Sequence, residues 1–218
     1  MDGNFVIVGA GGLGREVQLY LDDVLHGSGS ANFKGFLDDN PQNISLEKVR
    51  SLWLGTIADY SIQNSDRFLV AVGEPRTRRA IVQSLSARGA RFGTLIHPTS
   101  YLAAGSAIGP GSILAPFCFV GPGAAIGAHV VFNTYASCGH DSVVGDYSVF
   151  SPYAVVNGNV HVEEGVFLGT HATVVLGKSV GRDSKIGAGC TALRDIPARS
   201  LALGNPAQAR EVYSEPEA

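Results

Sequence analysis

The chain has few of the residues and segments that mark several large classes of protein. Its 218 residues include three cysteines, none of them in the C-x-x-C spacing of a metal site. No run approaches the roughly 20 apolar residues that a membrane-spanning helix needs. The N-terminus lacks the basic and then apolar pattern of a signal peptide. We therefore expect a cytoplasmic protein with no metal site and no membrane partner.

Charge is also sparse. The chain carries 16 Lys and Arg against 19 Asp and Glu, which gives a net charge of −3, and its basic residues form few clusters. A protein that holds nucleic acid normally presents a basic patch to the phosphates. The composition therefore argues against nucleic acid as the main partner.

The most regular feature is a period of six. Between residues 96 and 192 every sixth residue is apolar, the residue two places earlier is usually small, and glycine often follows. The apolar series is Ile96, Leu102, Ile108, Leu114, Val120, Ile126, Phe132, Cys138, Val144, Phe150, Val156, Val162, Leu168, Val174, Val180, Ile186 and Ala192. This period predicts a hexapeptide-repeat parallel β-helix, a triangular prism in which three repeats make one coil.

The repeat also indicates what lies inside the prism. Cys118, Cys138 and Cys190 occupy inward slots, so we expect them to behave as small core residues. Lys178 occupies a slot meant for a small residue, and Leu176 and Gly177 precede it. We therefore expect the last coil to be irregular.

Residues 1–95 lack this period and read as alternating strands and helices. Strands are predicted at residues 5–8, 33–37 and 67–72, with helices after Gly14 and over residues 75–88. This order predicts a small parallel α/β sheet of Rossmann-like type. We thus predict two domains, residues 1–95 and residues 96–218.

A glycine loop joins the first predicted strand to the first helix. Gly9, Gly11 and Gly14 give the G-x-G-x-x-G pattern in the setting where it binds phosphate at a helix N-terminus. Asp38 and Asp39 follow the second strand, where a Rossmann unit contacts a ribose. An NAD enzyme is one interpretation, although about 95 residues leave little room for a complete dinucleotide site. A glycine turn that only packs helix on strand is another.

Six histidines are candidates for proton transfer. None of those in the repeat lies in an inward series, so we expect none to have a buried core role, and we take His161 and His171 as exposed. We expect His97, which precedes Pro98, to close the linker strand. His140 stands out because Asp141 follows it, and a carboxylate can hold an imidazole base in one tautomer. Neighbours on an extended strand point apart, so this pairing requires a turn.

The whole chain resembles the sugar acetyltransferases typified by the sialic acid O-acetyltransferase NeuD and the bacillosamine-pathway N-acetyltransferase PglD. The segments that carry the resemblance appear in the family's order, at residues 8–12, 35–39, 71–73, 95–98, 133–134, 139–141, 144–146 and 204–207. Leu13 departs from the pattern, because many members have histidine there.

The resemblance implies a left-handed β-helix, a homotrimer and acetyl-CoA as co-substrate. It makes His140 the general base and Asp141 its orienting partner. The substrate-binding residues it implies are Gly11, Gly12, Leu13, Asp38, Asp39, Gly73 and Asn133. The cofactor-binding residues it implies are Val149, where some relatives have a second histidine, Gly158, Thr170 and Ala188. Residues 194–209 match a terminal cap over the nucleotide end of CoA.

The resulting functional hypothesis is N-acetylation of an amino group on a nucleotide-linked sugar by direct attack, with His140 as base. O-acetylation of a sugar hydroxyl, as in the sialic acid branch, is not distinguished by these residues. A non-catalytic nucleotide-binding trimer is a third interpretation. A prism that acts only as a scaffold is a fourth.

Overall fold

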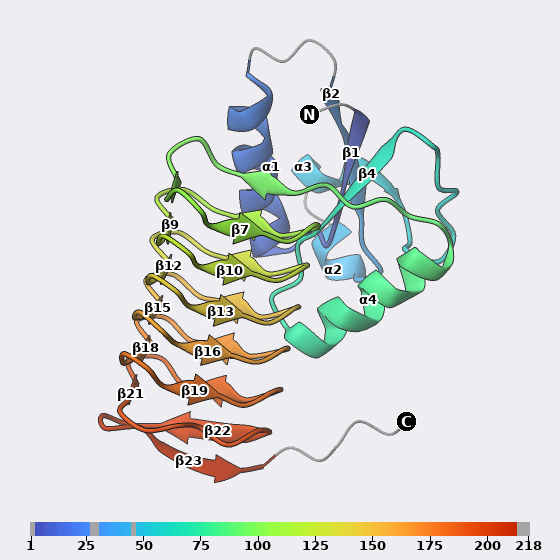
Figure 1. Cartoon of the computed structure of the whole chain (residues 1–218). Coiled ribbons are helices and arrows are strands. Elements are labelled where there is room, and N and C mark those ends of the chain that lie inside the picture. The colour runs from blue at the N-terminus through green and yellow to red at the C-terminus, as the bar shows by residue number, and fades with distance from the viewer. Residues whose placement is uncertain (1–2, 27–30, 45–46, 213–218) are drawn as a thin grey trace.

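The computed structural model describes residues 3–26, 31–44 and 47–212, which form a small α/β domain beside a triangular prism (Figure 1). The elements of the α/β domain are β1 (Gly3–Val8), α1 (Gly12–Leu25), β2 (Ala31–Leu37), α2 (Pro41–Ile44), α3 (Glu47–Arg50), β3 (Trp53–Gly55), β4 (Asp66–Val70) and α4 (Pro75–Ala87). Its four strands are all parallel, in the order β3-β2-β1-β4. The predicted parallel α/β sheet is confirmed.

The turn from β1 into α1 depends on glycine. A Cβ atom on Gly14 would lie 1.8 Å from the carbonyl oxygen of Gly9, and Gly9 itself has a φ of +98°. A side chain at Gly14 would therefore push the helix off the strand, which is the packing role of the third glycine in this motif.

The prism consists of two-residue strands on three faces. Face I holds β5 (Leu95–Ile96), β8 (Ile113–Leu114), β11 (Val131–Phe132), β14 (Val149–Phe150), β17 (Phe167–Leu168) and β20 (Lys185–Ile186), and continues into the hairpin β22 (Ser200–Leu203) and β23 (Gln208–Glu211). Face II holds β6 (Tyr101–Leu102), β9 (Phe119–Val120), β12 (Ser137–Cys138), β15 (Val155–Val156), β18 (Thr173–Val174) and β21 (Thr191–Ala192). Face III holds β7 (Ala107–Ile108), β10 (Ala125–Ile126), β13 (Val143–Val144), β16 (His161–Val162) and β19 (Ser179–Val180). We name each edge by the two faces that it joins.

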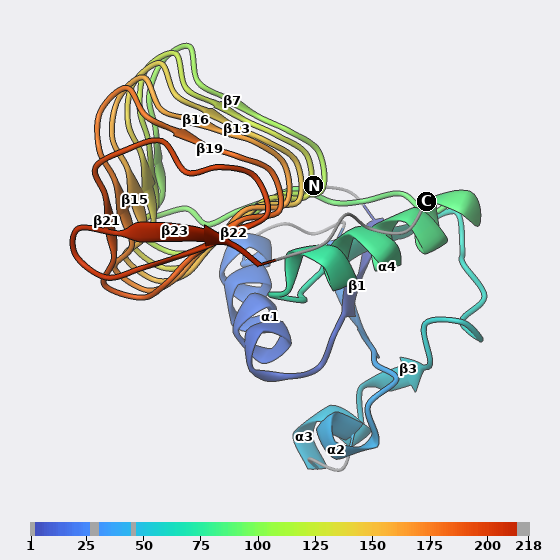
Figure 2. The same ribbon diagram turned by 90° about the horizontal axis from the view of Figure 1, so that it is seen from below.

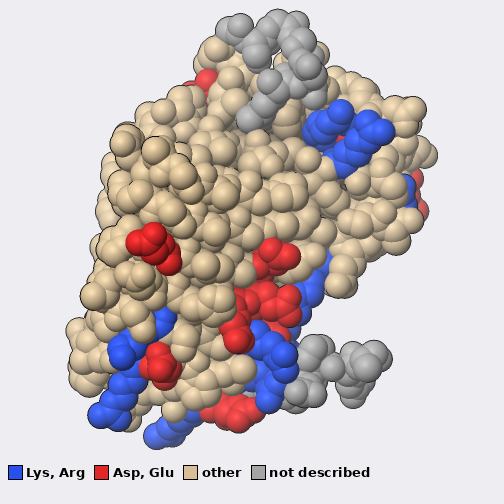
Figure 3. Space-filling model, viewed as in Figure 1, with Lys and Arg blue, Asp and Glu red and all other residues tan. Residues whose placement is uncertain are grey.

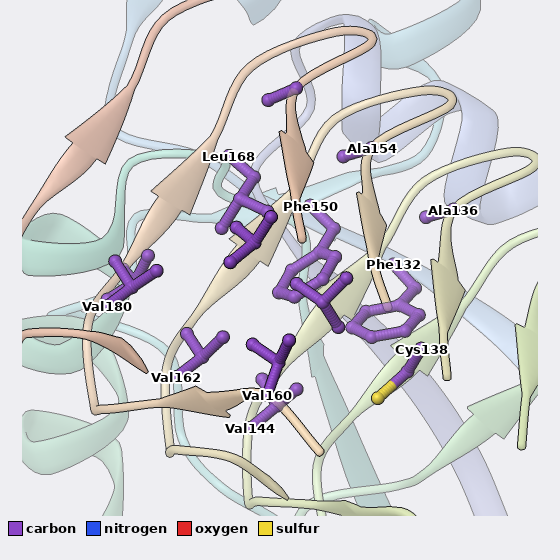
Figure 4. Close-up of a cluster of buried hydrophobic side chains, with 14 of the residues drawn as sticks. Phe132, Ala136, Cys138, Val144, Phe150, Ala154, Val160, Val162, Leu168 and Val180 are labelled. Carbon is purple, nitrogen blue, oxygen red and sulfur yellow. The ribbon is translucent and has the colours of Figure 1, made fainter. Parts of the chain in front are cut away.

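The fold is the predicted left-handed β-helix, and each strand residue from β5 to β18 pairs with the residue eighteen positions further on. Val143, for example, pairs with both Ala125 and His161. The apolar series fills the interior, where Phe132 and Phe150 stack 4.2 Å apart (Figure 4). The pairing of Ile186 with Ala202 leaves only sixteen residues in the last coil, so the expected irregularity is confirmed.

The α/β domain packs on face I (Figure 2). Outward side chains of this face form one hydrophobic cluster with α1, including Ile113 and Val131 from the prism and Val17 and Leu21 from the helix. Burial of this size stabilises the contact by about 1.5–3 kcal/mol for each large side chain. The two domains are therefore joined by a continuous core. Among the described helices, none has the length and hydropathy for a membrane crossing.

A second contact joins α4 to edge III/I. The guanidinium of Arg79 lies 3.3 Å from Asp183 and 3.7 Å from Glu164, and it also lies over the ring of Tyr147. Its neighbour Arg78 is fully buried, and none of its three guanidinium nitrogens has a hydrogen-bond partner among the described residues. Burial lowers the pKa of Arg78 to about 9, since a charge without a partner is costly in a dry interior.

These two arginines predict opposite effects of one substitution. Arg78→Met removes an uncompensated buried charge and keeps much of the volume, so the free energy of unfolding should rise by about 1–3 kcal/mol. Arg79→Met removes paired contacts and should lower it by about 1 kcal/mol or more. Chemical denaturation of both variants measures the two changes. A large loss of stability in Arg78→Met would contradict the assignment of this charge as unpaired.

Candidate active site

His140 and Asp141 form a pair at edge II/III, in the turn between β12 and β13. Asp141 has a φ of 56°, in the left-handed region, and this turn brings the two neighbouring side chains together. The Nδ1 atom of His140 lies 2.9 Å from Oδ2 of Asp141. The side chains are 52% and 62% exposed, so the pair is open to solvent. With Nδ1–H donated to the carboxylate, Nε2 carries the lone pair and can accept a proton.

A pocket of about 510 Å³ lies at the carboxyl ends of the parallel strands in the α/β domain. Six of the seven predicted substrate-binding residues line it: Gly11, Gly12, Leu13, Asp38, Asp39 and Gly73. Helix α1 starts here with Gly11 as its N-cap, and no side chain caps it. Its first N–H groups therefore face the pocket without a protein partner from a cap, as an anion site requires.

Asp38 has a different task from the one expected for a ribose-binding carboxylate. It is 6% exposed, and it accepts hydrogen bonds from the Ala10 backbone N–H at 2.6 Å and from the Asn43 side chain at 2.9 Å. These bonds hold the glycine loop against the segment after β2. Asp39 accepts from the Ile57 backbone N–H at 2.8 Å and is exposed, so it remains available to a ligand.

Several pocket residues have no motif in the sequence. Asn43, Ile57, Thr77 and Ile81 line the same pocket. Thr77 follows the N-terminus of α4, where Glu74 accepts its backbone N–H at 2.7 Å. The one signal that would have found such residues is position, because the segments after β2 and β4 converge on the same end of the sheet.

The remaining predicted site residues lie on other parts of the prism. Gly158 lies beside His140 at edge II/III, one coil further on. Asn133, Thr170 and Ala188 lie in turns of edge I/II, which is the neighbouring edge. Asn133 donates from its side chain to the Phe150 carbonyl at 3.1 Å. No single groove of one chain brings all of these residues together.

The expected place of Val149 in the cofactor path is contradicted. Its side chain is 1% exposed and lies in the cluster between face I and the α/β domain. As an outward residue of face I it is covered by α1, so a ligand reaches it only if the two domains separate. We therefore leave Val149 out of the proposed site.

Two histidines of the repeat are buried, although neither lies inside the prism, where none was expected. His97 is 7% exposed, with Nε2 lying 3.1 Å from Asp23 of α1. His129 is 8% exposed and lies edge-on to Phe92 at 4.7 Å. Both are outward residues of the prism that the α/β domain covers. His161 and His171 are exposed, as predicted.

A cleft of about 400 Å³ lies at the far end of edge II/III. It is lined by Leu193, Arg194, Asp195, Ile196, Pro206, Ala207, Gln208 and Ala209, and all of these except Leu193 belong to the predicted terminal cap. Arg194 holds the same position in its turn as His140, three coils away. Within the described residues, no cluster of three His, Cys, Asp or Glu side chains is arranged to hold a metal ion.

The fold and the paired His140 and Asp141 define a β-helix protein with the features of an acyltransferase, and comparisons narrow the class. Residues 4–85 match the model of the PglD N-terminal domain. The acetyltransferase domain of PglB from Neisseria gonorrhoeae is 29% identical, with a TM-score of 0.86 over 96% of this chain and 100% of that domain. PerB from Caulobacter crescentus is 27% identical, with a TM-score of 0.82 over 95% of this chain and 97% of PerB.

Curated relatives match over shorter segments. The dTDP-3-amino-3,6-dideoxy-alpha-D-galactopyranose 3-N-acetyltransferase of Aneurinibacillus thermoaerophilus is 39% identical over 51 residues, which are 23% of this chain and 27% of that enzyme. The chain thus spans about a quarter of the length of the curated relatives that it matches. Taken with the full-length structural matches, these findings show that the chain is similar over its whole length to sugar acetyltransferases of the hexapeptide-repeat type and that residues 4–85 match a PglD-type N-terminal domain.

The buried His129 predicts a dependence of stability on pH. Burial, with a smaller effect of the positive charge of Arg78, lowers the pKa of His129 to about 4. An unfolded chain binds this proton near pH 6.5, so the unfolded state gains protons first as the pH falls. Stability should therefore decrease between about pH 6.5 and 4, by about 1.4 kcal/mol per pH unit at most.

The His129 ring lies edge-on to Phe92 and stacks on Tyr147 at 5.5 Å. The variant His129→Phe keeps a ring between these two side chains and should flatten this slope, measured by urea denaturation at several pH values. His171→Phe is the matched control, because His171 is an exposed histidine in an equivalent turn position. An unchanged slope in His129→Phe would contradict the prediction.

Proposed function

We propose that the protein transfers the acetyl group of acetyl-CoA to an amino group of a nucleotide-linked sugar. The observation that carries this proposal is the pair of His140 and Asp141, whose geometry leaves the imidazole Nε2 free to accept a proton. The ligands and names of similar proteins support acetyl-CoA and a nucleotide-linked amino sugar as the substrates. The neisserial domain has been solved with acetyl coenzyme A, PerB with CoA and GDP-perosamine, and the Aneurinibacillus enzyme is named for a dTDP-amino sugar.

In the proposed reaction the neutral amine attacks the thioester carbonyl carbon, and a C–N bond forms as the C–S bond breaks. Nε2 of His140 takes the proton that the amine releases, and Asp141 stabilises the imidazolium that results. The imidazolium then returns the proton to the CoA thiolate, so that His140 ends neutral. A positioned base of this kind contributes about 10²- to 10⁴-fold in rate.

Direct attack is preferred over a covalent enzyme intermediate. Cys118, Cys138 and Cys190 are all buried in the prism, and burial raises the pKa of Cys118 and Cys138 to about 12. A thiol of this kind supplies almost no thiolate near neutral pH.

We propose that the nucleotide occupies the pocket of the α/β domain. The first turn of α1 would hold the pyrophosphate, and the exposed Asp39 would contact the ribose or the base. Asp38 would act by holding the glycine loop in shape through Ala10 and Asn43.

The cofactor would follow edge II/III from His140 to the terminal cleft. Arg194 lies three coils from His140, about 14 Å at the usual spacing of paired strands. This length suits an extended pantetheine arm, and Arg194 would meet the phosphates of the nucleotide end.

The proposed site needs a second copy of the chain. The pocket belongs to the domain that covers face I, whereas His140 lies at the opposite edge of the prism (Figure 2). Asn133, Thr170 and Ala188 on edge I/II could reach the same ligands only from a neighbour. In Figure 3 the surface over β7–β16 is largely uncharged, and charged side chains gather over the last coils. We propose a homotrimer in which neighbouring prisms complete each site.

Release of free CoA from acetyl-CoA tests the activity, with a panel of UDP-, GDP- and dTDP-linked 4-amino sugars and with sialic acid and its CMP form. We expect turnover on an amino sugar nucleotide and a loss of about 10²-fold or more in kcat for His140→Ala. Turnover with the sialic acids alone would move the protein to O-acetylation. Binding of a sugar nucleotide without turnover on any acceptor would contradict the enzyme and leave the non-catalytic trimer.

Mixed assemblies test the shared site. Gly12→Glu adds a carboxylate to the phosphate end of the pocket, where a side chain meets nothing within 4 Å, and His140→Ala removes the base. Each variant should be inactive alone. Co-expressed in equal amounts, they should recover about a quarter of the wild-type rate, because one site in four then has both parts intact. A mixture as inactive as its components would show that each chain carries a complete site.

A further inference from the structure

The imidazole of His140 lies directly against the backbone of Gly158. A Cβ atom on Gly158 would lie 2.3 Å from Nε2, 2.5 Å from Cε1 and 2.8 Å from Cδ2 of the ring. These distances are all below 3.0 Å, so no side chain at this position is compatible with the observed ring. The ring is therefore held at two points, by Asp141 at Nδ1 and by the bare glycine at the edge that contains Nε2.

The turn itself does not require glycine at this position. Gly158 is not among the residues with positive φ, so an L-amino acid can adopt its backbone conformation. Equivalent positions of other coils in this row carry Pro122, His140, Leu176 and Arg194. The fold therefore accepts side chains along this row. Glycine is required at position 158 because the His140 ring lies against it.

We propose that Gly158 is a positioning residue. Because it has no side chain, the His140 ring lies directly against its backbone, and this contact holds Nε2 where the acceptor must meet it. The catalytic part of this inference rests on the proposed function. A methyl group at 158 would move the ring outward, because the half-exposed imidazole has solvent to move into. The movement would break the bond to Asp141 and carry Nε2 away from the acceptor.

The substitution Gly158→Ala should leave the fold intact and damage the reaction. The displaced atoms belong to an exposed side chain, so we expect a melting temperature close to that of the wild type. We expect kcat to fall about 10- to 100-fold, since a misplacement of about 1 Å costs this much. The KM for acetyl-CoA should change by less than about twofold, because no binding group is removed.

A double variant separates positioning from a direct contact with the cofactor. In the His140→Ala background the imidazole is absent, so the methyl group of Gly158→Ala has no ring to displace. We therefore expect no further loss when the two changes are combined. A multiplied loss, or a rise in the KM for acetyl-CoA, would overturn the proposal and make Gly158 part of the cofactor path.

The positioning role of Gly158 can also be tested without turnover. In the ligand-free protein, the ¹⁵N resonances of the His140 ring should report hydrogen on Nδ1, and Gly158→Ala should shift the population towards hydrogen on Nε2 as the Asp141 bond is lost. Unchanged resonances would overturn the positioning role even in an active enzyme. The expected shift in a protein with no acetyltransferase activity would support the positioning of the His140 ring by Gly158 and refute the proposed function.

Discussion

The eighteen-residue register of the prism is the constraint on which the rest of the structure depends. Because each strand bonds to the equivalent strand of the next coil, residues eighteen apart lie against each other along the axis. This register stacks Phe132 on Phe150 inside, and it lays His140 on Gly158 outside. A site on such a prism is therefore specified by rows of the sequence, and a catalytic residue inherits its neighbours from one coil before and one coil after.

Much of this architecture could be predicted from the sequence. A period of six in apolar residues has one physical solution, so the prism, its inward series and its irregular last coil followed from the pattern. The glycine loop likewise predicted a ligand site at the start of α1, and six of the seven substrate-binding residues that the family resemblance implies line the pocket there. These features are local, because each depends on residues that are close in the chain or separated by a constant period.

The features that could not be predicted arise where the two domains meet. The period assigns Val149 and His129 to the outside of the prism, which is correct, but it says nothing of what covers the outside. Helix α1 covers Val149, and Phe92, from the segment between α4 and β5, covers His129. Asp38 differs in the same way, because its bonds to Ala10 and Asn43 depend on how two loops converge. Contacts between distant segments carry no period, so a single sequence does not reveal them.

The contact between the α/β domain and the prism also explains how a site divided between two chains can work. If the nucleotide binds to one chain and the base belongs to another, the two parts must keep a constant separation, since positioning accounts for much of the rate. The continuous core of α1 on face I and the ion pairs of Arg79 fix the pocket relative to its own prism. Packing of one prism on the next would then fix it relative to the neighbouring His140. In the proposed trimer the burial of Val149 adds rigidity, and the exposed pair of His140 and Asp141 is the half of the site that a neighbouring copy would cover.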